Sequence, residues 1–240
     1  MTPVTSTDPD GVDTAERRLP LSRELIISAA VAFVDSHGLS ALTMRGLGKE
    51  LGVEAMSLYR YVNGREDLLE GVVESMVSEL HLNPDTVEPL NGWQAYLQWL
   101  AHGVRRIEQE HPAVFPLIAT RHPAAPWLRP PLRSLRVVED FLSELISRGF
   151  TDESAIAAYR AFSSFLLGHL LLEAAARTAE SDIVDTLGHA EIASAGAESS
   201  VTAFPQVCRL GTRLSEDHSD NEFEAALENM LDRLDRTLAH

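Results

Sequence analysis

Apolar side chains recur every three or four residues through most of the chain, which is the spacing of one face of an α-helix. The first such stripe lies between Ser22, a suitable N-cap, and Gly38, a suitable C-terminal stop. No stretch alternates strictly between apolar and polar residues, as a half-buried strand would. The pattern therefore predicts an all-α protein. Further helices are expected at residues 65–80, 92–110, 111–120, 132–148, 152–177, about 199–213 and 223–238.

The segment 43–61 predicts two short helices joined by a tight turn. Thr43 is a suitable N-cap, and Gly52 can adopt a left-handed conformation without a steric penalty. On the second helix, Leu58 and Val62 are placed to point back toward the first. Two short helices joined in this way form a helix-turn-helix, whose second helix enters the major groove of DNA. The segment therefore predicts a DNA-binding surface.

Charge is distributed unevenly along the chain. Residues 17–65 hold seven Lys and Arg against four Asp and Glu, a net charge of +3 that leaves −19 for the rest of a chain whose total is −16. A mildly basic end on an acidic protein suits contact with DNA at that end only. The same imbalance would also arise by chance in an ordinary acidic protein. Arg17 and Arg18 are either a DNA-contacting arm or simply solvated.

Composition and spacing divide the chain into three parts. Residues 1–20 are rich in Thr, Asp, Pro and Gly and have no apolar period, so we expect a disordered tail. Residues 21–65 are expected to form a three-helix helix-turn-helix domain, and residues 66–240 a larger helical domain. Within the larger domain, 83–91 is a Pro-punctuated connection, and 178–198 is small, acidic and aperiodic, as in a flexible loop.

Cysteine use and hydropathy indicate the compartment. The single cysteine, Cys208, leaves no disulfide framework within the chain and fits a reducing cytoplasm. We find no apolar run that approaches the roughly 20 residues needed to cross a bilayer. The N-terminus carries acids and prolines, unlike a signal peptide. The sequence therefore predicts a cytoplasmic protein with no membrane partner.

Residues 42–72, LTMRGLGKELGVEAMSLYRYVNGREDLLEGV, resemble the DNA-binding region of the TetR (tetracycline repressor) family of transcriptional regulators. The elements LT-x-R-x-L-x-x-x-LGV, S-LY-x-Y-V and R-E-x-LL carry the resemblance, because spacing, turn glycine and Leu-Tyr pair coincide. A weaker similarity to the tetracycline-repressor type of C-terminal domain covers WQAYL (93–97), EHP (110–112), GF (149–150), AYRAFSSFLLGHLLLEAA (158–175) and FEAALENMLDRL (223–234).

The resemblance implies a homodimer that binds an inverted-repeat operator in double-stranded DNA. The helix at 152–177 and the C-terminal helix would pack against their twofold mates as a four-helix bundle. A cavity in each C-terminal domain, residues 66–240, would take a small-molecule effector. Its binding would shift the helix at 65–80, so that the two DNA-binding domains no longer fit one operator. The implied protein is a ligand-responsive repressor that uses no cofactor.

The outward side of the second motif helix holds the candidate base-reading residues. Arg60 can read a guanine through its bidentate fork, and Ala55 or Met56 can contact a thymine methyl group. Ser57 and Tyr59 are expected to bond phosphate oxygens, which set register rather than sequence. The alternatives are that the Tyr59 ring packs under its helix and that Arg60 is merely solvated. The predicted DNA-contacting residues are Thr43, Met44, Arg45, Ala55, Met56, Ser57, Tyr59, Arg60, Tyr61 and Arg65.

Apolar and aromatic residues of the second domain are candidates for lining the effector cavity, although each has an alternative role as plain core. His169 either bonds a neighbour or points at a ligand. An ungapped alignment of EHPAVFPLIATRHP puts Ile118 where the tetracycline repressor has its magnesium-binding histidine. An aliphatic side chain cannot ligate a hard cation, so we expect no metal site and a largely apolar or aromatic effector. The candidates are Met76, Trp93, Leu97, Leu100, Phe115, Ile118, Phe141, Phe165 and His169.

Two other functional classes stay open at this point. One is a helix-turn-helix protein without a small-molecule effector, which is controlled by a protein partner or acts constitutively. The other is an all-helical enzyme. Against an enzyme, we find no Gly-rich phosphate loop, HExxH motif, Cys/His cluster or nucleophile elbow. The Asp and Glu residues are also expected at solvent-facing positions of amphipathic helices.

Overall fold

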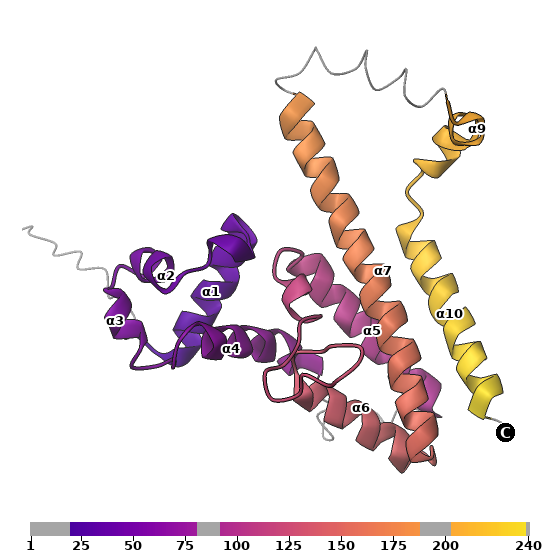
Figure 1. Ribbon diagram of the computed structural model, residues 1–240, viewed down its shortest axis with the longest axis horizontal. Helices are drawn as coiled ribbons and strands as arrows, with labels where there is room; N and C mark the ends of the chain where they lie inside the picture. Colours follow the sequence, from indigo (N-terminus) through magenta and orange to yellow (C-terminus); the bar gives the residue numbers. More distant parts are fainter. Residues whose placement is uncertain (1–19, 81–91, 188–202, 239–240) are drawn as a thin grey trace, which may run out of the picture.

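The computed structural model describes residues 20–80, 92–187 and 203–238. Every regular element in these ranges is a helix, so the all-α prediction is confirmed. Figure 1 shows two parts: a group of short helices, α1 to α4, and a group of longer helices, α5 to α10. We call the first part the head and the second the body. The predicted tail before Pro20, including Arg17 and Arg18, and the predicted connection at 83–91 lie outside the described residues.

The head follows the predicted order of elements. Its first helix is capped as expected, because the Leu25 amide donates to Ser22 Oγ at 3.1 Å and Gly38 ends the helix at a φ of 79°. A short 3₁₀ turn that the sequence pattern did not indicate then leads into the motif. The elements are α1 (Arg23–His37), η1 (Leu39–Ala41), α2 (Met44–Glu50), α3 (Ala55–Leu58), α4 (Arg65–Val77) and η2 (Ser78–Leu80).

The helices of the head pack around one small apolar core. Ile26 and Val34 from α1 meet Leu47 from α2 and Leu58 from α3, and all four side chains are fully buried. The fourth helix packs against α1 and also against α5 of the body. Since α4 is shared in this way, the orientation of the head depends on a helix that the body also contacts.

The body is organised around one long helix. The helix α7 (Asp152–Leu187) packs against α5 (Gly92–Glu110), α6 (Leu135–Ser147) and α10 (Ser219–Leu238). In Figure 1, α10 runs beside α7, whereas α9 (Pro205–Leu214) lies beyond the end of α10. No side chain of α9 is buried.

Three predicted boundaries were wrong. The long helix continues to Leu187, ten residues past the predicted end, so 178–187 is helical and only 188–198 of the expected loop lies outside the described residues. Residues 111–120 form turns around η3 (Phe115–Leu117), because Pro112 and Pro116 cannot donate the hydrogen bonds of a helix. The helix α3 has a single turn, continued by turn residues to Tyr61.

The expectation about membrane-length segments also needs correction. Residues Asp152–Arg177 of α7 are long and apolar enough, with a mean hydropathy of 1.4, to cross a membrane by length and composition alone. The core helix of a soluble protein passes the same test. Here α7 lies among three other helices of the body, and Phe162, Leu166 and Leu170 are buried in the core. Its hydropathy is explained by packing on several sides.

Candidate nucleic-acid interface and ligand cavity

The turn between α2 and α3 is held at close range by backbone contacts. The Val53 amide donates to the Gly48 carbonyl at 2.8 Å, and Gly52 occupies the left-handed region at a φ of 66°. A Cβ atom at Gly48 would lie only 2.9 Å from the Val53 carbonyl oxygen. Glycine at position 48 therefore lets the backbone of α2 approach the start of α3, and this contact fixes how α3 is presented.

The helix α3 and its following turn have one buried and one exposed side. Leu58 and Val62 are buried in the head core, as their spacing predicted. On the opposite side, the side chains of Met56, Tyr59 and Tyr61 are 75%, 46% and 38% exposed. This outer surface is free to meet the edges of base pairs in a groove.

The ten predicted DNA-contacting residues all lie on α2, on α3 and its turn, or at the start of α4. Thr43 Oγ1 caps α2 by accepting the Gly46 amide at 3.0 Å. Arg65 Nε lies 3.5 Å from the Leu42 carbonyl, so its side chain reaches back from α4 toward the start of α2. Met44, Ala55 and Ser57 are half-buried, and the exposed members are Thr43, Arg45, Met56, Tyr59, Arg60, Tyr61 and Arg65.

The body contains an almost wholly apolar cavity of about 40 Å³. It lies where η2, α5, α6 and α7 meet. Three of the nine candidate residues, Leu100, Ile118 and Phe141, line it. Sequence periodicity marked its other walls only as core, since it does not show which core residues border a gap. They are Val77, Leu80, Val104, Leu132, Ser134, Val137, Tyr159, Phe162, Ser163, Leu166 and Leu167.

The few polar groups around the cavity are engaged by neighbours. The Tyr159 hydroxyl donates to the Pro130 carbonyl at 3.0 Å, and burial raises the pKa of this phenol to about 12. Ser134 Oγ caps α6 by accepting the Val137 amide, and donates to Glu74 of α4 at 3.4 Å. The cavity thus offers an apolar interior and a polar wall residue that touches α4.

The other six candidates lie elsewhere in the body or at its border. Leu97 and Phe115 are fully buried in the core, and Trp93 packs edge-on against Phe150. Met76 lines a groove between α1 and α5. Phe165 and His169 pack against Phe223 of α10.

Comparison with known proteins decides the family. A family model described as "Tetracyclin repressor-like, C-terminal domain" matches residues 84–238, and one described as "Bacterial regulatory proteins, tetR family" matches residues 26–72. The chain belongs to the TetR family. The resemblance inferred from residues 42–72 is thereby confirmed, and the two matches cover head and body in turn.

Individual TetR-family relatives match parts of the chain. It is 30% identical over 148 residues to the HTH-type transcriptional repressor DrrR1 of Streptomyces coeruleorubidus, which covers 62% of this chain and 52% of that repressor. It is 29% identical over 164 residues to the tetracycline repressor protein class E of Escherichia coli, covering 68% and 74%. The chain thus spans about half the length of DrrR1, and 61% of an HTH-type transcriptional regulator of Saccharopolyspora erythraea.

Solved TetR-family structures share the whole fold. A possible TetR family regulator from Streptomyces coelicolor A3(2) superimposes with a TM-score of 0.67 at 25% identity, covering 90% of this chain and all of that one. ActR from the same organism, in complex with (S)-DNPA, gives 0.63 at 26% identity, with coverage of 92% and 100%. The arrangement of head and body is therefore that of TetR-family regulators.

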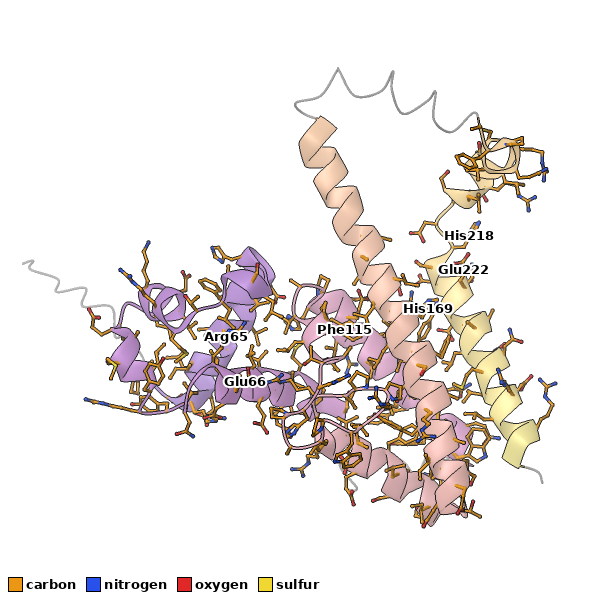
Figure 2. All side chains as sticks on the ribbon, viewed as in Figure 1. Arg65, Glu66, Phe115, His169, His218 and Glu222 are labelled. Carbon is orange, nitrogen blue, oxygen red and sulfur yellow. The ribbon has the colours of Figure 1, made fainter. Side chains whose placement is uncertain are left out.

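In this TetR-family chain, one face of α4 is held by the loop that precedes α6. Glu66 and Glu74 stand two helical turns apart. Glu66 Oε2 lies 2.7 Å from Arg133 Nη2, and Glu74 accepts the hydrogen bond from Ser134. Figure 2 shows Glu66 beside Arg65 at the start of α4. Periodicity alone could not have found these contacts, because the partners are 60 or more residues apart in sequence.

The body also buries charged groups, contrary to the expectation that its acids face solvent. Glu108 of α5 is fully buried and pairs with Arg177 of α7. Arg105 Nη2 lies 2.9 Å from Glu173 and 2.8 Å from Asp220, and its guanidinium stacks on the Phe223 ring. These pairs join α5, α7 and α10. Long polar side chains reach one another across the packed helices, which helical spacing does not reveal.

Next to this cluster, a polar hollow of about 380 Å³ opens between α7 and the start of α10. His169 lines it, and Figure 2 shows this residue on α7 facing the part of α10 that holds Glu222. No group of three or more His, Cys, Asp or Glu side chains within the described ranges could hold a metal ion. At the predicted magnesium-histidine position, Ile118 presents an aliphatic side chain to the apolar cavity.

Proposed function

We propose that this protein is a ligand-responsive transcriptional repressor that binds a palindromic operator as a homodimer. A small, largely apolar or aromatic molecule in the cavity bounded by α5, α6 and α7 would release it from DNA. One observation carries the proposal: an exposed reading surface on α3 and an enclosed apolar cavity in the body both connect to α4. The chain's membership of the TetR family supports this reading over an all-helical enzyme. The protein would act in the cytoplasm, where its DNA lies.

The head supplies both kinds of DNA contact in this proposal. Arg60 is exposed beside Met56, and the two would read base edges in the major groove. Thr43, Arg45 and Arg65 flank them and would bond phosphates, which fixes the register of the head on the duplex. Tyr59, whose side chain is about half exposed, would also bond phosphate.

A second copy of the chain would complete the DNA-binding unit. Exposed apolar side chains on α7, among them Ile156 and Leu172, favour burial of this helix against a twofold mate. A twofold dimer binds two half-sites roughly 34–36 Å apart, or a multiple of that distance. A monomer by light scattering at working concentration would contradict the dimer.

The size of the cavity sets a condition on effector binding. Small-molecule sites typically measure roughly 300–1,000 Å³, whereas this cavity of about 40 Å³ holds at most a few water molecules. An effector must therefore push the surrounding helices apart. Because Ser134 is part of the cavity wall and also bonds Glu74, such opening acts on α4.

Relatives indicate which compounds to use as probes. Structures of ActR are of complexes with (S)-DNPA and with actinorhodin, and a TetR from Acinetobacter baumannii AYE was solved with minocycline. For this chain, the apolar lining and Ile118 favour a compound held without a metal ion. We therefore expect (S)-DNPA or actinorhodin, more than minocycline, to raise the melting temperature.

The first experiment tests DNA reading. Duplexes are selected from a random pool with the wild-type protein, and affinities are then measured by fluorescence anisotropy. Arg60→Ala should reduce discrimination between the selected duplex and its variants by roughly 1–3 kcal/mol. Arg136→Ala, which removes an exposed arginine from α6, is the matched control and should change nothing. Equal loss on every duplex would make Arg60 a phosphate contact, and failure to select any inverted repeat would contradict the proposal.

The second experiment tests the cavity. Val137→Phe adds volume to a half-buried wall residue, so the variant should still bind the selected duplex but resist release by any active probe. Val207→Phe on exposed α9 is the matched control and should be released like wild type. Release of Val137→Phe at wild-type probe concentrations would place the effector elsewhere. A protein that binds its duplex but responds to no probe would support the constitutive or partner-controlled regulator.

A further inference from the structure

The short link between the DNA-reading turn and α4 is fastened by one carboxylate. Asp67, in the first turn of α4, accepts the Asn63 amide at 2.7 Å and the Asn63 side-chain amide at 3.1 Å. Gly64 between them provides no side-chain cap, so Asp67 performs the reach-back role of a capping box. The link is thus tied to α4 by two bonds to a single oxygen, Oδ2.

One arginine from a distant helix joins this carboxylate to the DNA-reading turn. Arg23, at the start of α1, donates from Nη2 to Asp67 Oδ1 at 2.6 Å and from Nη1 to Asp67 Oδ2 at 3.2 Å. The same Nη1 donates to the Tyr61 carbonyl at 3.0 Å. A planar guanidinium can hold a carboxylate and a carbonyl at fixed angles, whereas an ammonium is a point charge without that geometry.

The charges of the pair favour a permanent contact. Hydrogen bonding from Arg23 lowers the pKa of the Asp67 carboxyl, which the Asn63 amide lowers further. The same hydrogen bond raises the pKa of Arg23. Both groups are therefore charged at any pH at which the protein would bind DNA, and the contact does not come and go with protonation.

We propose that Arg23 is a positioning residue for DNA reading, acting through the Tyr61 carbonyl and Asp67. It fixes the angle at which residues 56–61 are presented, relative to both α1 and α4. Because the body holds α4 through Glu66 and Glu74, this clamp also passes the orientation of α4 to the reading turn. The inference rests on the proposed DNA-binding function and adds a specific residue to it.

Two readouts test the clamp in the full-length protein. The first is independent of DNA: hydrogen exchange of backbone amides 59–64. Arg23→Gln should accelerate exchange there by roughly ten-fold while amides in α5 and α6 keep wild-type rates, since roughly 1.4 kcal/mol of local holding is lost. Arg23→Lys keeps the charge but not the fork, and should fall between wild type and Arg23→Gln. Unchanged exchange at 59–64 in Arg23→Gln would overturn the clamp.

The second readout is affinity for the duplex selected by wild type, measured against salt. Arg23→Gln should weaken binding roughly ten-fold without changing the slope of log affinity against log salt, because no phosphate contact is removed. Arg45→Gln is the contrast, and should reduce that slope by about one. Asp67→Asn should weaken binding similarly, and Arg23→Gln/Asp67→Asn should be no weaker than the worse single variant, since both break one contact.

The outcomes separate the possible roles. A reduced salt slope in Arg23→Gln would make Arg23 a direct phosphate contact and overturn the proposal. Faster exchange throughout the head and body, with unchanged affinity of the folded fraction, would show a role in global stability only, and would overturn it as well. If wild type selects no duplex, the proposed function fails, while the exchange measurement still decides whether Arg23 holds the reading turn.

Discussion

The head and the body of this protein hold their chemistry in opposite places. The head displays it: Met56 and Arg60 are exposed on a short helix whose other side is buried through Leu58. The body encloses it: the apolar cavity and the buried Glu108 are both covered by packed helices. A surface that reads DNA must be presented ready for contact, whereas a cavity of about 40 Å³ must change shape before it holds an effector. The comparison therefore predicts that stability and DNA binding respond to different substitutions.

The largest expected effect on stability lies in the body. Phe162→Ala removes a side chain that is 2% exposed and borders the cavity, so the substitution enlarges an existing gap. The free energy of unfolding should fall by roughly 3–5 kcal/mol, because transfer and cavity terms add. Urea unfolding at constant protein concentration measures the change. A loss below about 1 kcal/mol would show that the helices collapse onto the gap, and that the cavity wall adapts more easily than its packing implies.

The head could be predicted from the sequence almost residue by residue because its contacts are local. Leu58 and Val62 were expected to be buried from helical spacing, and both are. Thr43 was expected to cap α2, and its hydroxyl oxygen accepts the Gly46 amide. The cap spans only three residues, so sequence distance and spatial distance nearly coincide. The Arg23–Asp67 clamp escaped prediction because its partners are 44 residues apart.

The body was predicted in outline but not in detail, for the converse reason. Helical spacing gave its long helices, since one apolar face suffices for that. Spacing could not tell which buried residue borders a gap, so Leu100 was placed near the cavity together with Leu97, which is plain core. Nor could it show that Glu108 is buried, because the partner Arg177 is 69 residues away. Such pairings depend on how four helices cross, which no single segment encodes.

The second largest effect tests how tightly the head is built. Gly48→Ala would place a Cβ 2.9 Å from the Val53 carbonyl oxygen, a backbone atom that cannot move without displacing the turn. We expect a loss of roughly 1–3 kcal/mol in unfolding free energy, together with weaker DNA binding. The matched control is Gly211→Ala, where no atom lies within 4 Å of the new Cβ and α9 should gain roughly 0.5–1 kcal/mol. Equal effects of the two substitutions would contradict the close approach of α2 and α3.

A smaller effect returns to the cavity wall. Tyr159→Phe removes the hydroxyl that bonds the Pro130 carbonyl, and should cost roughly 0.5–1.5 kcal/mol. Burial raises the pKa of Tyr159 from 10.0 to about 12, so between these values the unfolded chain loses this proton while the folded protein keeps it. Stability should therefore fall as pH rises through this window, and fall less steeply in Tyr159→Phe. Burial raises the pKa of Tyr96 too, so the difference between wild type and variant isolates Tyr159. Parallel pH curves would contradict the buried phenol.

The smallest expected effect on stability is also the sharpest test of the comparison. Met56→Ala truncates a side chain that is 75% exposed on the outer face of α3, so unfolding free energy should stay within about 0.5 kcal/mol of wild type. The same change removes an apolar group placed to touch a thymine methyl, so discrimination at one operator position should relax in anisotropy titrations against single-base variants. Phe162→Ala should show the reverse, with a large loss of stability and an unchanged base preference in its folded fraction. If Met56→Ala instead destabilised the protein and left base preference intact, Met56 would belong to the packing of the head. The division between a displayed reading surface and an enclosed regulatory core would then fail at its most exposed residue.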